Sequence, residues 1–282
     1  MDTVEDIKLG ELPAGVIEAA AKHVVNYSIG FLHVNNNPPR SSEDFELLGS
    51  GTLVSVGTTY AILTADHVLS VLPRSGRLGL ILSPTVQQYT IDIQGIAYVQ
   101  IARGKREEDG PDLGAIILSS SIATAIGAKK VFYNLDAHRD EALSSPPHIH
   151  DGFWFVNGFV DEKTLEERDE DGYALVKRFY NLSGAGGPDK VTVVGDYDYF
   201  DFPVSNSERS VAPKSFGGMS GGGLWQVPLK RGAGGEIEHK TPILSGVVFY
   251  QEPTTETYCG VKCHGRQSVY RMAFDALKEK TP

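Results

Sequence analysis

Ser220 lies in a glycine-rich stretch, residues 215–225, which reads SFGGMSGGGLW. Glycine has no Cβ, so such a loop lets backbone N–H groups come close to a bound substrate and point at one place. Converging N–H donors of this kind stabilise the oxyanion of an acyl-transfer reaction. The same composition also fits an ordinary hairpin turn before a strand. The segment therefore predicts either a plain turn or the site of a nucleophilic serine.

A histidine and an aspartate upstream are of the types that a nucleophilic serine needs as partners. His67 ends a strand-like apolar run, and Asp112 stands at the start of another apolar run, just after a charged stretch at 103–109. Taken singly, each has an ordinary structural explanation, as a packed or surface histidine and as a turn residue beside Pro111. Together with Ser220 they form a set able to transfer a proton to and from a hydroxyl nucleophile.

The order His67, Asp112, Ser220 is that of the chymotrypsin-like arrangement, whereas α/β-hydrolases and subtilisins have other orders. Three motifs in this order carry the resemblance: LTADHV at 63–68, DLGAI at 112–116 and GMSGG at 218–222. In these motifs, and over most of its length, the chain resembles a trypsin-like (chymotrypsin-fold) serine protease of the non-zymogen bacterial type.

The resemblance implies a role for each matched residue. Ser220 would attack the scissile carbonyl, His67 would take up its proton, and Asp112 would orient the imidazole. The backbone N–H groups of Gly218 and Ser220 would form the oxyanion hole. The implied substrate pocket is lined by Lys214, Ser215, Phe216, Gly217, Phe249, Tyr250 and Gln251.

Three residues depart from the family pattern. Met219 stands where zymogens carry an aspartate that binds a newly cut N-terminus, so we predict an oxyanion loop that is preformed or ordered by a partner. Phe249 replaces a hydroxyl residue that supports the catalytic aspartate, so Asp112 must find another donor. Lys214 lies near the pocket floor; an inward ammonium would favour acidic side chains before the cut, and an outward one would not.

GMSGG also satisfies the Gly-x-Ser-x-Gly pattern of a nucleophile elbow. That motif requires a strand before the serine, a helix after it, and an aspartate and histidine downstream. Residues 206–218 do not read as a buried strand, a strand pattern follows the serine, and 62 residues remain after it. The elbow is therefore disfavoured.

The composition favours an all-β protein. The 282 residues include 31 Gly and 15 Pro between short β-branched runs, with 41% hydrophobic and 22% charged residues, as in a folded soluble protein. We predict two six-stranded antiparallel β-barrels with an N-terminal helix and a C-terminal helix. The expected domains are a helical extension at 1–26, a first barrel at 27–120, a linker at 121–150, and a second barrel with the C-terminal helix at 151–282.

Individual elements follow from the periodicity. Helices are expected over 13–25 and 272–279. The strands expected in the first barrel are 27–34, 48–56, 59–65, 78–82, 88–101 and 113–119. Those expected in the second are 152–160, 173–181, 190–203, 222–228, 243–250 and 267–271. His67 and Asp112 then belong to one barrel and Ser220 to the other, which predicts a site between the barrels.

Charge limits the partners. The net charge of −10 argues against nucleic acid, which is bound by clustered Lys and Arg. Residues 161–171 hold seven acids and two bases, net −5; they read as a solvated loop or, alternatively, as a docking surface for a basic partner. No apolar stretch approaches the roughly 20 residues of a membrane span, and the acidic N-terminus does not resemble a secretory signal. We therefore expect a cytoplasmic protein with no membrane contact.

Two cysteines agree with a reducing compartment. Cys259, Cys263 and His264 lie close enough in sequence to suggest a metal site, but no second pair of ligands accompanies them. Two free thiols in a loop are the favoured interpretation, and no metal or cofactor is expected.

The function predicted from these residues is serine endopeptidase, acting on a polypeptide substrate through an acyl-enzyme. A regulatory protein partner is compatible with the preformed or partner-ordered loop. The alternative is a catalytically silent protease-fold module that binds a peptide or partner. The three intact residues His67, Asp112 and Ser220 argue against silence.

Overall fold

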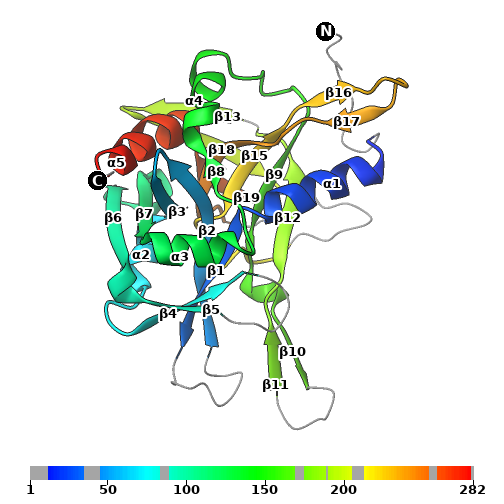
Figure 1. Ribbon diagram of the computed structural model, residues 1–282. Helices are drawn as coiled ribbons and strands as arrows, with labels where there is room; N and C mark the ends of the chain where they lie inside the picture. The colour runs from blue at the N-terminus through cyan, green and yellow to red at the C-terminus, as the bar shows by residue number, and fades with distance from the viewer. Residues whose placement is uncertain are drawn as a thin grey trace.

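The computed structural model describes residues 12–34, 45–82, 89–168, 175–188, 190–204, 213–253 and 259–280. Two curled, mainly antiparallel β-sheets form its body (Figure 1). Among the helices in these ranges, none has both the length and the apolar composition needed to cross a bilayer.

The first sheet holds the N-terminal half of the strands. Its order is β5-β4-β1-β2-β3-β7-β6, with β8 added in parallel beside β2. The two outer strands, β5 and β6, follow each other in the chain through the short 3-10 turn η3 (Ile93–Gly95), which brings the ends of the sheet together. The strands are β1 (Ser28–Val34), β2 (Phe45–Val56), β3 (Thr59–Thr64), β4 (Arg77–Ile81), β5 (Tyr89–Asp92), β6 (Ile96–Arg103), β7 (Asp112–Leu118) and β8 (Tyr133–Asn134).

The second sheet holds the C-terminal half. Its order is β12-β9-β15-β18-β19-β14-β13, and a bridge between Gly186 and Val204 joins the region of β12 to that of β14. The strands are β9 (Phe153–Phe159), β12 (Asn181–Gly186), β13 (Lys190–Val194), β14 (Tyr197–Pro203), β15 (Gly223–Val227), β18 (Ile243–Gln251) and β19 (Gly260–His264).

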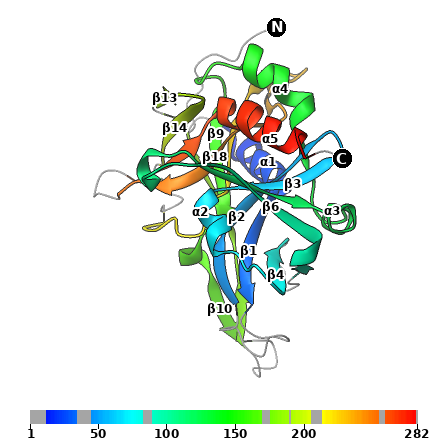
Figure 2. The same ribbon diagram turned by 90° about the vertical axis from the view of Figure 1, so that its left-hand side faces the viewer.

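Two hairpins stand outside these sheets. One is β10 (Leu165–Arg168) with β11 (Leu175–Arg178), and the other is β16 (Leu229–Arg231) with β17 (Ile237–His239). The β10–β11 hairpin extends away from the body at the end opposite α4 and α5 (Figure 1, Figure 2).

Helices cover the sheets. They are α1 (Ala14–Val25), α2 (Asp66–Val71), α3 (Ser120–Gly127), α4 (Leu135–Ser144) and α5 (Phe274–Lys278), with 3-10 turns η4 (Glu107–Asp109) and η5 (Asp161–Lys163) and a π-helical segment η6 (Ser268–Ala273). The apolar face of α1 buries Ala20 and Val24 in a core that it shares with Trp225 of β15 and with Phe274 and Leu277 of α5. This shared core connects both ends of the chain to the second sheet.

The all-β prediction is confirmed, together with the N-terminal and C-terminal helices. The sheets have eight and seven strands and not six each. In the first sheet, the segment predicted as one strand over 88–101 forms β5 and β6, and β8 is added. In the second, the segment 190–203 forms β13 and β14, and β19 was not predicted. The segment 121–150 contains α3, β8 and α4. Part of the acidic run forms η5 and β10 rather than a loop, and residues 169–171 lie outside the described residues.

The strand predicted over 267–271 is wrong, because this segment is helical. Buried and exposed side chains here follow the period of a helix: residues 269, 270, 273, 274 and 277 are buried, whereas Arg271 and Asp275 are exposed. In a strand, Arg271 would lie on the same face as Val269. The Asp198 carboxylate also accepts the backbone N–H of Gln267 and of Ser268, at 3.0 and 2.8 Å. A distant side chain therefore satisfies donors at the start of this helix.

Candidate active site

His67 lies in the first turn of α2, immediately after the fully buried end of β3. Ala65 joins the two elements in an extended conformation, so the chain turns from strand to helix within one residue. The imidazole remains 30% exposed. A sharp exit from a buried strand thus places a histidine at the surface with its backbone fixed.

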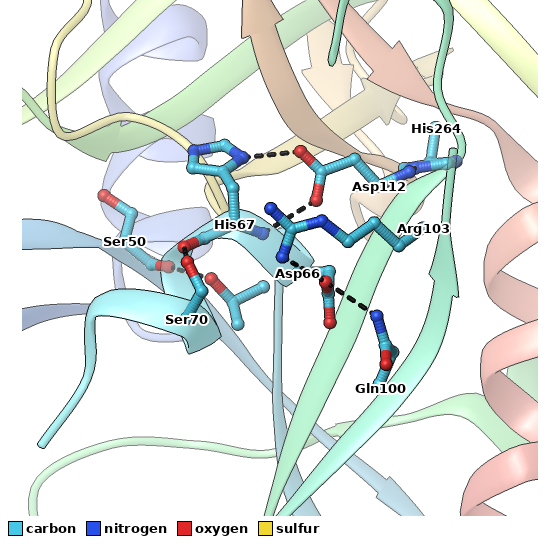
Figure 3. Close-up of polar contacts among 9 residues, drawn as sticks. Ser50, Asp66, His67, Ser70, Gln100, Arg103, Asp112 and His264 are labelled. Atoms are coloured by element: carbon cyan, nitrogen blue, oxygen red, sulfur yellow. Dashed lines mark hydrogen bonds and ion pairs between the residues drawn. The ribbon is translucent and has the colours of Figure 1, made fainter. Parts of the chain in front are cut away.

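Asp112 meets His67 through both carboxylate oxygens. Oδ1 accepts the backbone N–H of His67 at 2.9 Å, and Oδ2 lies 2.5 Å from His67 Nδ1 (Figure 3). Burial by itself would raise the pKa of Asp112, but the hydrogen bonds and charge of His67 outweigh it, and the pKa is lowered. An ionised Asp112 keeps the proton on Nδ1, which leaves Nε2 of the neutral imidazole as a base.

Asp112 has a second histidine partner that the sequence analysis did not foresee. Nε2 of His264, at the end of β19, accepts the backbone N–H of Asp112 at 3.0 Å. His264 is fully buried, and its ring lies 4.7 Å from that of Phe249. Phe249 thus offers no hydroxyl to Asp112, and the added hydrogen bond reaches the Asp112 backbone instead.

Burial lowers the pKa of His264 to about 4. The neutral ring must carry its proton on Nδ1, since Nε2 accepts a hydrogen bond, and Nδ1 has no hydrogen-bond partner among the described residues. Protonation of Nε2 would put two donors face to face, at Asp112 N–H and at His264. His264 must therefore be neutral to accept the hydrogen bond from the Asp112 backbone N–H.

We expect this buried histidine to make stability depend on pH. The pKa of His264 is about 4 in the folded chain and about 6.5 in the unfolded chain. Between these pH values the unfolded chain binds a proton at His264 and the folded chain does not, so stability that is present above pH 6.5 is lost as the pH falls towards 4. The loss is on the order of 3 kcal/mol at pH 4. Urea unfolding of the wild type and of His264→Gln at pH 7, 5.5 and 4.5 should show a clearly flatter dependence in the variant.

The matched control for this experiment is His150→Gln, which removes an exposed histidine. It should follow the wild-type curve. Equal pH slopes for His264→Gln and the wild type would contradict a neutral buried His264.

A buried carboxylate beside His67 anchors the helix that carries it. Asp66 accepts hydrogen bonds from Gln100 Nε2 at 3.0 Å and from Arg103 Nη1 at 3.2 Å, both on β6 (Figure 3). These contacts connect the N-terminus of α2 to the first sheet. Asp66 was not among the predicted site residues, although its place next to the histidine in LTADHV was a usable signal.

The loop that carries Ser220 is a tight, ordered turn. Met219 N–H donates to Phe216 O at 2.9 Å, and Gly218 has a φ of +91°, as in the third position of a type II turn. This pattern leaves the N–H groups of Gly218 and Ser220 without a hydrogen-bond partner among the described residues. Both predicted oxyanion donors are therefore available to a ligand.

Met219 anchors this turn by packing. Its side chain is fully buried in the core of the second sheet with Phe216, Leu224 and Val248. An apolar anchor requires no charged N-terminus to order the loop. This packing agrees with the expectation that the loop is preformed.

Ser220 lies close to the start of α2, on the other side of Gly49. A Cβ placed on Gly49 would stand 2.8 Å from the Val68 side chain and 3.4 Å from Ser220 O. Among the described residues, however, no hydrogen bond joins the Ser220 hydroxyl to His67. The structure thus joins His67 to Asp112 by hydrogen bonds and places the Ser220 segment near them, without a hydrogen bond from Ser220 to His67. Catalytic hydrogen bonds are often long before substrate binds.

The two segments expected to line the substrate pocket are tied together by one side chain. Gln251 Oε1 accepts the N–H of Phe216 at 2.8 Å, and its Nε2 donates to Lys214 O at 3.3 Å. Phe216 and Phe249 are buried, whereas Lys214 is exposed. The preference for acidic residues before the cut stays a prediction.

The grouping of Cys259, Cys263 and His264 does not form a ligand set. Cys263 and His264 are successive residues of β19 and therefore point to opposite faces of the sheet. Cys263 is buried in the core, where burial raises its pKa, and Cys259 lies near Pro213 O. Neither cysteine forms a disulfide, and Cys263 belongs to a strand and not to the expected loop.

No protein-family model and no curated protein matches the chain. Among solved structures, it is similar to an inactive mutant form of Rv3671c from M. tuberculosis H37Rv, with 11% identity and a TM-score of 0.46. The match covers 96% of this chain and 95% of that one. Structural similarity at this TM-score does not support a functional assignment, so the proposed function depends on the geometry of the site.

Proposed function

We propose that this chain is a serine endopeptidase with Ser220 as nucleophile, His67 as general base and Asp112 as the group that orients His67. The observation that carries the proposal is the double contact between Asp112 and His67, to the ring at 2.5 Å and to the backbone at 2.9 Å. It gives the histidine a single useful tautomer, with Nε2 as the base. The glycine turn with its two available N–H donors supplies the second requirement.

In this proposal, Ser220 Oγ attacks the scissile carbonyl carbon while its proton passes to His67 Nε2. The carbonyl oxygen becomes an oxyanion held by the N–H groups of Gly218 and Ser220. The C–N bond then breaks, and the departing amine takes the proton from His67. Water, deprotonated by the same histidine, cleaves the acyl-enzyme and restores Ser220.

Strand β18 offers a place for an extended polypeptide. Its ladder with β15 ends at Val247, and the N–H and C=O of Val248 bond to Gly222 and Gly221 of the Ser220 loop. Phe249 and Tyr250 continue the strand past that loop. A substrate could add to this segment through main-chain hydrogen bonds.

A catalytically silent peptide-binding module is the second candidate. It is favoured by one observation, the lack of a hydrogen bond between Ser220 and His67 among the described residues. Such a module would bind peptides without an activated serine. The two candidates differ in whether Ser220 is nucleophilic.

A fluorophosphonate probe tests the proposal. It should label the wild type at Ser220, and His67→Ala should lose almost all labelling because the hydroxyl is no longer deprotonated. His150→Ala, which removes an exposed histidine, should label like the wild type. A folded wild type that stays unlabelled would favour the silent module. Labelling of Ser220 that survives His67→Ala would instead contradict the role of His67 as the general base.

A further inference from the structure

Ser50 joins the oxyanion turn to the first sheet. It lies on β2, is fully buried, and its hydroxyl donates to Gly218 O at 2.7 Å. The same oxygen accepts the N–H of Phe159 at 2.8 Å, and the backbone N–H of Ser50 donates to Ser220 O at 2.8 Å. The Ser50 hydroxyl also lies 3.4 Å from Phe159 O. Because this contact is longer, the single hydroxyl proton is donated to Gly218 O.

These contacts fix two peptide groups of the turn. The Gly218–Met219 peptide is held at its C=O by Ser50 Oγ and at its N–H by Phe216 O. The Ser220–Gly221 peptide is held at its C=O by Ser50 N–H and at its N–H by Val248 O, at 2.7 Å. The peptide that carries the Ser220 N–H lies between these two and is therefore oriented from both sides.

The Gly218 N–H belongs to the Gly217–Gly218 peptide, whose C=O accepts the backbone N–H of Asp161 at 2.9 Å. Ser50 Oγ holds the next peptide, on the other side of the Gly218 Cα. Gly217 and Gly218 have no Cβ, so rotation of the neighbouring peptides meets little steric resistance. In the observed turn, Gly218 has a φ of +91°, a conformation that is one of several open to glycine. The hydrogen bond from Ser50 to Gly218 O favours the one conformation in which the Gly218 N–H is left for a ligand.

We propose that Ser50 is a positioning residue for the oxyanion hole: its hydroxyl holds the Gly218 carbonyl and, together with the Asp161 N–H on the Gly217 carbonyl, keeps the Gly218 N–H aimed at the developing oxyanion. This inference rests on the proposed peptidase function. Ser50 touches neither substrate nor the reacting atoms, and it acts through the turn. Its loss should therefore weaken binding of the transition state more than binding of the substrate.

Ser50→Ala is the test, with Ser55→Ala as matched control. Ser55 is another buried serine of β2, and the structure gives it no contact with the turn. We expect Ser50→Ala to lower kcat tenfold or more, short of the roughly 10²–10³ lost when an oxyanion donor is removed outright. Affinity for a peptide boronate, which forms a tetrahedral adduct with the serine, should fall by a similar factor, with KM changed less than about threefold. Ser55→Ala should leave kcat and boronate affinity near the wild type.

Unfolding in urea shows whether each variant is folded under the assay conditions. If Ser50→Ala does not fold, Ser50→Cys keeps nearly the same side-chain volume with a much weaker donor and takes its place. An active wild type with equal kcat and boronate affinity in the Ser50 and Ser55 variants would overturn the role of Ser50 alone. A raised KM at unchanged kcat would do the same. A wild type without peptidase activity or probe labelling would overturn the proposed function itself.

Discussion

Ser220→Ala is expected to abolish peptidase activity and leave the fold intact. Removing the nucleophile prevents the acyl-enzyme, and losses on the order of 10⁶ in kcat are typical for this change in serine proteases. The structural contacts of Ser220 use its backbone, through the hydrogen bond from Ser50 N–H to Ser220 O at 2.8 Å, and alanine keeps this contact. The free energy of unfolding should therefore change by no more than about 0.5 kcal/mol.

The measurement is the hydrolysis rate of a protein or peptide substrate, set beside urea unfolding of the same preparation. Ser55→Ala, which truncates a serine of β2 remote from the turn, should keep full activity. Peptidase activity in Ser220→Ala at the wild-type level would show that another group is the nucleophile. A folded, inactive variant that still binds peptide would support the proposed assignment.

The second large effect is expected from Asp112→Asn, with a fall of roughly 10⁴ in kcat near neutral pH. The asparagine amide can present its NH₂ to His67 Nδ1 while its oxygen accepts the backbone N–H of His67. The imidazole proton would then reside on Nε2, where a base is needed. The loss would thus come from the wrong tautomer and from the missing negative charge beside the imidazolium.

Asp66→Asn is the control for Asp112→Asn, since it removes a neighbouring buried negative charge. Asp66 binds Gln100 and Arg103 and does not bind the imidazole. Its replacement should lower kcat far less than that of Asp112. Equal losses in the two variants would point to a general charge effect, and an Asp112→Asn enzyme within tenfold of the wild type would contradict the orienting role.

The local sequence was enough to predict the fold class and to propose the candidate site residues His67, Asp112 and Ser220. Frequent glycine and proline between short β-branched runs indicate many short strands, and the structure has two curled β-sheets. His67 and Asp112 were predicted at strand ends; His67 lies in the first turn of α2, just after β3, and Asp112 is the first residue of β7. The strand predicted over 267–271 is wrong because the apolar residues 269, 270, 273, 274 and 277 follow the period of a helix, a pattern that the sequence contains.

The support of the site could not be predicted in this way. His264 is 152 residues from Asp112, and Ser50 is 168 residues from Gly218, yet each pair is joined by a hydrogen bond. Nothing in the local pattern around His264 distinguishes a partner of Asp112 from a metal ligand, because the difference depends on which face of β19 meets β7.

For this protein, the sequence by itself determined which side chains are candidates for the proposed peptidase chemistry and near which strands and turns they lie. Only the tertiary structure decided how those groups are held: Asp112 by His264, the glycine turn by Ser50, and Met219 by the core of the second sheet. The physical reason is that local periodicity specifies the face on which a side chain lies. The register and packing of distant strands then select which donor meets which acceptor.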